Sequence, residues 1–257
     1  MKGIIALMTG FGLICALFPI RGGMAAEPNT IEEYFFKANQ AYGEGRFQEA
    51  ISDYHRVIEN GQRNGHLYYN LANAYFREKD LGRAVLFYER ARLFIPRDGD
   101  LNFNLRYALE QTRDALAEPQ DFLGQTFFWL NGLTLEEVMR VFIALNILFW
   151  GVLVLRLFVR PEWTYYTFLL IFVLWLIGGL SFGAKWYQIE TDNRCVILPA
   201  EVAVHAGPQE GDTVLFKLHQ GAMVHGERAE DGWTLVRLPD KKRGWLENTA
   251  IERIIPR

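Results

Sequence analysis

The chain has 257 residues, of which 50% are hydrophobic and 22% charged, and this charge content excludes wholesale disorder. The net charge of −3, from 27 basic and 30 acidic residues, gives no reason to expect nucleic-acid binding. Apolar residues concentrate at the N-terminus and between residues 138 and 183, which predicts a membrane protein with soluble flanks. The two cysteines, Cys15 and Cys195, exclude a disulfide framework and a cysteine-rich metal site.

Residues 1–26 have the three-part layout of a secretory signal peptide. Lys2 precedes an apolar stretch at 4–18, and small residues follow, among them Ala25 and Ala26. The apolar stretch is short for a membrane span. We therefore expect export of the chain and cleavage after Ala25 or Ala26, with an uncleaved anchor as the alternative.

Residues 32–116 repeat with a period of 34. The recurring pairs are Tyr34 and Tyr68, Ala38 and Ala72, Ala50 and Ala84, and Tyr54 and Tyr88. Small residues let two helices cross closely, and the tyrosines fill the space beside them. The pattern predicts two antiparallel helical hairpins with turns at 43–45 and 79–80, and then a capping helix at 101–116. Pro96 ends the second unit, since proline cannot continue a helix.

This pattern resembles the tetratricopeptide repeat family, most strongly at 68–96, with N-L-A-N-A-Y, G-R-A-V and Y-E-R-A. The resemblance implies an all-α superhelix over residues 27–118, whose groove binds an extended peptide or a partner helix. The family's groove positions fall on Phe35, Asn39, Tyr42, Tyr69, Asn73, Phe76, Arg77, Phe103 and Tyr107, with His66 and Asp100 at further positions. Aromatic rings suit such recognition, and the alternative is that they only pack the superhelix.

Asn39 and Asn70 also match the two asparagines of the carboxylate-clamp subgroup, which grips peptide C-termini. Phe35, Asp100 and Asn104 stand where the basic residues of that subgroup would be. We therefore do not expect a clamp mechanism.

A membrane hairpin is predicted after the repeats. Two apolar runs, 138–159 and 163–184, each have about 20 residues, enough for roughly 30 Å of hydrocarbon. Only Arg160-Pro-Glu162 lies between them, so the helices must be antiparallel neighbours. The linker at 119–137 contains an aromatic cluster at 127–130, typical of the water–lipid interface, and a capping box at 134–137. Arg156 lies one turn from the end of the first run and is expected to snorkel to the head groups.

The orientation of this hairpin depends on the signal peptide. Basic residues are balanced between the two ends of the spans, so the positive-inside rule gives no answer. Export places the repeats outside the cytoplasm, and two spans return the chain to the same side. We expect both soluble domains in one compartment and the hairpin turn in the cytoplasm.

Residues 196–257 change to short alternating runs separated by turns. The runs at 201–205, 214–218, 223–227, 233–238 and 244–246 predict five strands in a small all-β barrel. Their order resembles the bacterial SH3-like (SH3b) family, whose members bind cell-wall peptides or proteins. Trp233 and Trp245 are candidate surface aromatics in this domain, with a place in its core as the alternative.

The sequence shows no nucleotide-binding or nucleophile motif and no metal-ligand spacing, so we predict a protein without enzymatic activity, cofactor or metal. The whole arrangement resembles the BatE family of Bacteroides aerotolerance operons. That resemblance implies a scaffold in the bacterial inner membrane that works with von Willebrand factor A domain membrane proteins and a MoxR-type ATPase. We expect an adaptor with both soluble domains in the periplasm. Peptidoglycan binding through the SH3-like domain is the alternative, and an envelope stress sensor is a third.

Overall fold

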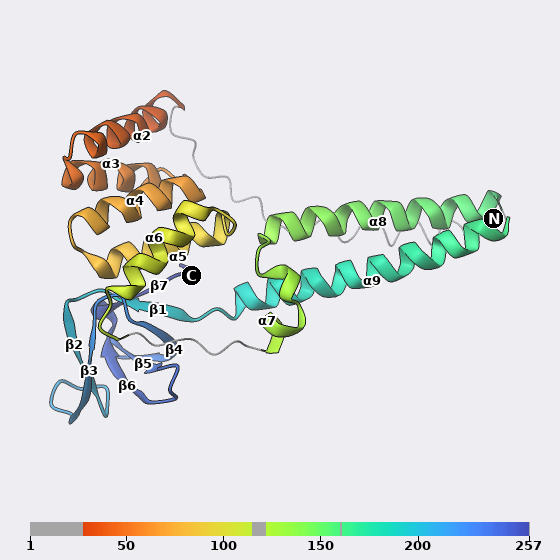
Figure 1. Cartoon of the computed structure of the whole chain (residues 1–257). Coiled ribbons are helices and arrows are strands. Elements are labelled where there is room, and N and C mark those ends of the chain that lie inside the picture. Colours follow the sequence, from red (N-terminus) through yellow and green to blue (C-terminus); the bar gives the residue numbers. More distant parts are fainter. Residues whose placement is uncertain (1–27, 115–121, 160, 257) are drawn as a thin grey trace.

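The computed structural model describes residues 28–114, 122–159 and 161–256, so the predicted signal peptide lies outside the described residues. A stack of paired helices leads into two long helices that project together, and the C-terminal strands form a sheet beside the stack (Figure 1). The three regions follow one another along the chain in the predicted order.

The N-terminal region consists of paired helices. They are α2 (Pro28–Gly43), α3 (Phe47–Glu59), α4 (Gly65–Arg77), α5 (Leu81–Phe94) and α6 (Gly99–Glu110). Asn64, Asp80 and Asp98 precede α4, α5 and α6, and each side chain accepts a hydrogen bond from the backbone three residues on. Both turns lie where the sequence predicts them. The predicted capping helix is present but ends earlier than expected, since α6 stops at Glu110 and residues 111–114 are not helical; residues 115–116 lie outside the described residues.

The positions that repeat at 34 residues form the core of this stack. Ala38, Ala72, Ala50 and Ala84 are 0% exposed, and Tyr54 and Tyr88 are 1% exposed. Alanines at these crossings let the helix backbones approach, and the buried tyrosine rings fill the adjacent volume. The helical pairs are therefore consistent with tetratricopeptide-like repeats.

The middle of the chain is a two-helix hairpin. Its elements are α7 (Phe122–Thr126), the short 3₁₀ helix η1 (Phe128–Leu130), α8 (Leu135–Phe158) and α9 (Glu162–Glu190). The capping box forms as predicted, because the Thr134 hydroxyl accepts from the Glu137 amide and the Glu137 carboxylate accepts from the Thr134 amide. Both long helices have the length and apolar composition to cross a membrane, and few of their residues are buried inside the molecule.

Aromatic rings and glycines hold the two long helices together. Phe149 stacks on Trp175 with 4.9 Å between ring centroids, and Phe142 stacks on Phe182 at 5.7 Å. Gly178 lies so close to α8 that a Cβ there would be 2.8 Å from Leu145 Cδ1. Near the tip of the hairpin, the Arg156 guanidinium lies 5.2 Å from the ring centroids of both Tyr165 and Phe168.

The C-terminal region is a seven-stranded antiparallel sheet. Its strands are β1 (Arg194–Ile197), β2 (Glu201–His205), β3 (Val214–His219), β4 (Met223–Glu230), β5 (Trp233–Arg237), β6 (Arg243–Glu247) and β7 (Ile251–Arg253). The strand order is β3-β2-β6-β5-β4-β1-β7. The five predicted strands are present, and β1 and β7 are additional. The predicted closed barrel is wrong, because β3 and β7 are the two edges of an open sheet.

The sheet stays open because its β1–β7 end packs on α5 of the helical stack. Val196 and Ile254 are fully buried in the same hydrophobic core as the repeat helices. Arg90, on α5, is 8% exposed and donates to the carbonyl oxygens of Ile254 at 3.0 Å and Arg253 at 2.8 Å. Its guanidinium also pairs with Glu252 at 2.8 Å. A helix thus covers the edge that a further strand would otherwise pair with.

A second contact joins the opposite edge of the sheet to the end of the stack. The backbone amide of His219, at the end of β3, donates to Asp114 Oδ2 at 2.6 Å, and its ring Nδ1 lies 3.2 Å from the same oxygen. One edge of the sheet therefore contacts α5, and the other contacts the segment that follows α6. Val196 and Ile254 join the core of the stack, while the sheet has a second core of its own around Val204, Val224 and Leu246.

His55 makes the stability of the stack depend on pH. Its Nε2 lies 2.7 Å from the Tyr75 hydroxyl, and burial lowers the pKa of His55 below its ordinary value of 6.5. Since the folded state favours the neutral ring, its contribution to stability is present above that value and is lost as the pH falls. We expect the melting temperature to fall more steeply from roughly pH 7 to pH 5 for the wild type than for His55→Gln, whose side chain does not titrate. Parallel pH profiles for the two proteins would contradict this assignment.

Candidate functional site

The nine residues predicted to line a binding groove all lie on α2, α4 and α6, the first helix of each unit. We call this set the repeat face: Phe35, Asn39 and Tyr42 on α2, Tyr69, Asn73, Phe76 and Arg77 on α4, and Phe103 and Tyr107 on α6. The second helices, α3 and α5, support it from behind through buried tyrosines. The local reason for this placement is the helical period, which brings residues three or four apart to one side of each helix.

Two identical hydrogen-bonded triads link the helices of the repeat face. Asn39 Oδ1 accepts from the Tyr54 hydroxyl at 2.7 Å and from Asn70 Nδ2 at 3.1 Å. The equivalent triad, displaced by 34 residues, has Asn73 Oδ1 accepting from the hydroxyl of Tyr88 at 2.6 Å and from Asn104 Nδ2 at 3.1 Å. Each triad ties three helices together.

Burial keeps the triad tyrosines in their donor form. It raises the pKa of Tyr54 and Tyr88 above the ordinary value of a phenol, so both hydroxyls stay protonated. Asn104 Nδ2 also donates to the Tyr69 hydroxyl at 2.9 Å. The triads were not predicted, although the 34-residue period connects Asn39 with Asn73 and Tyr54 with Tyr88. Within the stack, Asn39 and Asn70 are therefore hydrogen-bonded to each other.

The structure brings together the aromatic residues of α4 and α6. Phe76 contacts Tyr107 with 5.8 Å between ring centroids, and Phe103 stacks parallel to Tyr107 at 6.5 Å. Phe103 is 59% exposed and Tyr107 is 51% exposed. These two rings form an apolar surface on the last helix of the stack, open to solvent and held by the packing beneath it.

The α2 residues reach the rest of the repeat face through α3. Phe35 packs on Tyr54 at 6.1 Å and Tyr42 packs on Phe47 at 5.4 Å. The Arg77 guanidinium lies 5.0 Å from the Phe47 ring centroid and so joins α4 to the same ring. Phe35 and Tyr42 are half-buried against the core, as are Tyr69 and Phe76. The positions of these four rings are therefore explained by their packing against the core of the stack. Phe103 and Tyr107, in contrast, remain exposed to solvent.

Both candidate tryptophans of the sheet are covered. Trp233 is 8% exposed and Trp245 is 7% exposed. The His205 ring packs edge-on against Trp233 at 5.2 Å, and the Arg228 guanidinium lies 5.1 Å from the Trp245 ring centroid. Neighbouring side chains thus cover both tryptophans, although neither belongs to the hydrophobic core of the sheet, which is built around Val204, Val236 and Leu246.

Cys195 is a buried structural residue on β1. It is 1% exposed, its Sγ lies 3.5 Å from the Asn193 carbonyl oxygen, and burial raises the pKa of its thiol. A buried thiol of raised pKa has little of the thiolate that reacts as a nucleophile.

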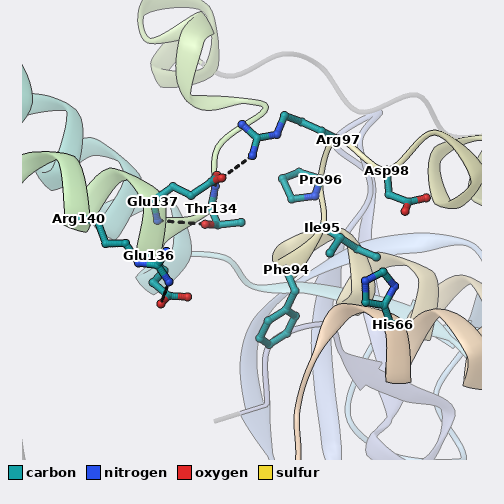
Figure 2. A pocket seen from close by; sticks show the side chains of 10 residues that line it. All are labelled: His66, Phe94, Ile95, Pro96, Arg97, Asp98, Thr134, Glu136, Glu137 and Arg140. Atoms are coloured by element: carbon teal, nitrogen blue, oxygen red, sulfur yellow. Dashed lines mark hydrogen bonds and ion pairs between the residues drawn. The ribbon is translucent and has the colours of Figure 1, made fainter.

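A cleft of about 440 Å³ separates the helical stack from the start of the hairpin (Figure 2). Arg97, just after α5, reaches across to Glu137 on α8, and Arg140 pairs with Glu136 on the same helix. His66, Phe94 and Asp98 line the side formed by the stack. Because the arginines of this cleft pair with its glutamates, the cleft does not favour a ligand of either positive or negative charge.

The described ranges, 28–114, 122–159 and 161–256, contain no group of three or more histidine, cysteine, aspartate or glutamate residues that could hold a metal ion. Comparison with protein-family models finds none that matches the chain, and a search of curated proteins finds no match.

Proposed function

We propose that this chain is a non-enzymatic adaptor, anchored in a bacterial inner membrane by α8 and α9, which presents the repeat face to protein partners on the periplasmic side. The repeats are then of the tetratricopeptide type, and the sheet is an open relative of the SH3-like fold. The observation that carries the proposal is the exposed Phe103–Tyr107 pair, because rings fixed by packing bind a partner with little loss of conformational entropy.

The membrane anchor rests on the exposed surface of the hairpin. None of the most apolar stretch of α8 and 11% of that of α9 is buried inside the molecule. Soluble monomers rarely expose an apolar surface of this kind, and lipid covers it at no cost in solvation. Both ends of the hairpin lie beside the folded regions, and its turn lies at the far tip (Figure 1). This geometry leaves both folded regions on the same side of a bilayer.

Reporter fusions test the topology. Alkaline phosphatase is active only outside the cytoplasm, so we expect activity when it is fused after residue 114 and after residue 257, and none when it is inserted in the turn at 159–162. A cytosolic fluorescent protein should give the reverse pattern. Phosphatase activity in only one of the fusions after residues 114 and 257 would contradict a two-span anchor. An even number of membrane crossings between these two positions requires the same result at both.

The partners we propose are membrane proteins with von Willebrand factor A domains, of the kind that the BatE family is expected to serve. Recognition by the repeat face requires a segment with apolar side chains, which the exposed rings of Phe103 and Tyr107 would cover. The triads behind the face keep its helices at a fixed spacing.

Partner recovery tests the repeat face. The double substitution Phe103→Ala/Tyr107→Ala removes the exposed rings and leaves the buried positions of α6 intact. We expect recovery of von Willebrand factor A domain proteins with the tagged full chain, purified from its own membranes, to fall by about tenfold or more. Quantitative mass spectrometry of the purified complexes measures this change.

Phe36 provides the matched control, since it is 69% exposed on α2 but lies about 100° around the helix from Phe35. Phe36→Ala should leave partner recovery unchanged. Equal recovery with the double variant and the wild type would refute the adaptor function of this face, provided that both have the same melting temperature.

Peptidoglycan binding through the sheet was the alternative, with Trp233 and Trp245 as its candidate aromatic residues. Both rings are covered by neighbouring side chains, which favours the adaptor over this alternative. We therefore advance the adaptor alone.

A further inference from the structure

A second cleft, of about 410 Å³, lies where the helical stack, the base of the hairpin and the first strand of the sheet meet. We call it the junction cleft. Its lining comes from α5 and α6, the segment before α8, the end of α9, and β1. The lining residues are Arg92, Leu93, Pro96, Asn102, Asn131, Leu133, Lys185, Ile189 and Arg194.

The charges of the junction cleft are all of one sign. Arg92, Lys185 and Arg194 line it, and none of the lining residues in the described part of the chain is acidic. The first cleft, lined by Asp98, Glu136 and Glu137 as well as by arginines, differs in this respect. Three cations around one cavity favour an anion.

Neighbouring carboxylates neutralise these cations only in part. Glu89 Oε2 accepts from Arg92 at 2.6 Å and from Arg194 at 3.4 Å, and Asp192 pairs with Arg194 at 2.7 Å. Lys185 instead donates to a neutral group, the Leu130 carbonyl oxygen, at 3.0 Å. Arg92 and Arg194 are thus paired with carboxylates, whereas the Lys185 ammonium contacts a neutral carbonyl. An ammonium group has three donors, so Lys185 can bind an anion while it keeps its bond to Leu130.

The position of the junction cleft matches the head-group level of a bilayer. Lys185 directly follows the apolar run of α9, and Leu133 lies two residues before the start of α8. Trp129 and Trp186, at the same end of the hairpin, are 42% and 53% exposed, as is typical of the water–lipid interface. Leu93, Leu133 and Ile189 add apolar contacts to the cationic lining.

We propose that the junction cleft binds the phosphate group of an anionic membrane lipid, with Lys185 as its principal cation and Arg92 and Arg194 beside it. This inference rests on the membrane anchoring in the proposed function. A lipid bound there would bridge the helical stack, the hairpin and the sheet, so that the folded regions are held against the membrane surface in one orientation.

Lipid retention tests the proposal. The full chain is reconstituted into nanodiscs of phosphatidylethanolamine and phosphatidylglycerol, and native mass spectrometry counts the phosphatidylglycerol molecules that stay bound. We expect Lys185→Gln to lower this retention by about tenfold, the usual effect of losing a charge-assisted hydrogen bond. Lys185→Arg should restore it. Arg140→Gln, which removes a cation at the base of α8 beside the first cleft, should leave it unchanged.

A second arm identifies the source of the phosphate. The protein stripped of lipid in detergent is titrated with inorganic phosphate and with short-chain phosphatidylglycerol. Tighter binding of the lipid, dependent on Lys185, supports the proposal. Equal binding of inorganic phosphate overturns the lipid assignment, and equal lipid retention by Lys185→Gln and the wild type overturns the site.

The experiment distinguishes an error in the proposed membrane anchor from an error in the proposed lipid site. If the hairpin does not span a membrane, the chain does not enter nanodiscs and is released from membranes by alkaline carbonate, and the proposed function fails with it. If the chain enters nanodiscs but keeps no selected lipid, the junction site alone is wrong.

Discussion

Arg90→Ala is expected to lower the free energy of unfolding by about 3 kcal/mol, because breaking a buried pair leaves its partners unpaired. The guanidinium is 8% exposed and holds the Ile254 and Arg253 carbonyl oxygens together with the Glu252 carboxylate. Alanine cannot replace any of these bonds, and water reaches the buried carbonyls only if the sheet moves away from α5. We therefore expect the contact between stack and sheet to open before either part unfolds.

Two measurements can detect the opening of the contact between the helical stack and the sheet. Chemical denaturation of the full chain in detergent gives the stability, and hydrogen–deuterium exchange of the peptides covering α5 and β7 reports opening of the interface. Val196 and Ile254 are fully buried against the stack in the intact structure, so exchange of these peptides should accelerate in Arg90→Ala. Arg106→Ala, at an exposed position on α6, is the control for loss of an arginine. An unchanged denaturation midpoint together with unchanged exchange would show that Arg90 does not hold the interface.

Gly82→Ala tests the same interface by adding atoms instead of removing them. A Cβ on Gly82 would lie 2.7 Å from the carbonyl oxygens of both Ile197 and Leu198, which are backbone atoms that cannot rotate away. Helix propensity favours alanine over glycine by roughly 0.5–1 kcal/mol. Overpacking costs about 1–3 kcal/mol, so the net effect should be a loss of stability.

Gly99 supplies the matched control for this substitution. It lies in the first turn of α6, and a Cβ there would meet nothing within 4 Å. Gly99→Ala should leave the melting temperature equal or slightly raised, whereas Gly82→Ala should lower it and accelerate hydrogen–deuterium exchange of the peptides covering α5 and β7. If both substitutions raised the melting temperature, helix propensity would outweigh packing, and the close approach of α5 to the sheet would be wrong.

Sequence patterns predicted most of the secondary structure. The 34-residue period located the crossing alanines, because each helical pair packs in the same way as the one before it. The capping box located the start of α8, because it depends only on Thr134 and Glu137, three residues apart. Strands β1 and β7 were missed, since four and three residues are too short to show an alternating pattern. The open sheet could not be predicted for the same reason, because those two strands create the edge that packs on α5.

The candidate site could be predicted only in part, because its surface depends on contacts between residues far apart in the sequence. Helix period correctly brought the rings of the repeat face to three neighbouring helices, but it could not distinguish the half-buried Phe76 from the exposed Phe103. The covering of Trp245 by Arg228 depends on the register of the sheet, which its alternating pattern leaves undetermined. The junction cleft draws its cations from three regions of the chain, and no local spacing connects them.

The acceptors of Arg90 follow it by 162 to 164 residues, after both apolar helices. During synthesis α5 therefore emerges long before the strand that covers it, and both long apolar helices are made in between. Until β7 is made, the Arg90 guanidinium lacks these acceptors, and the surface of α5 at Gly82 stays uncovered. A chain that stops before β7 never closes this surface of the stack.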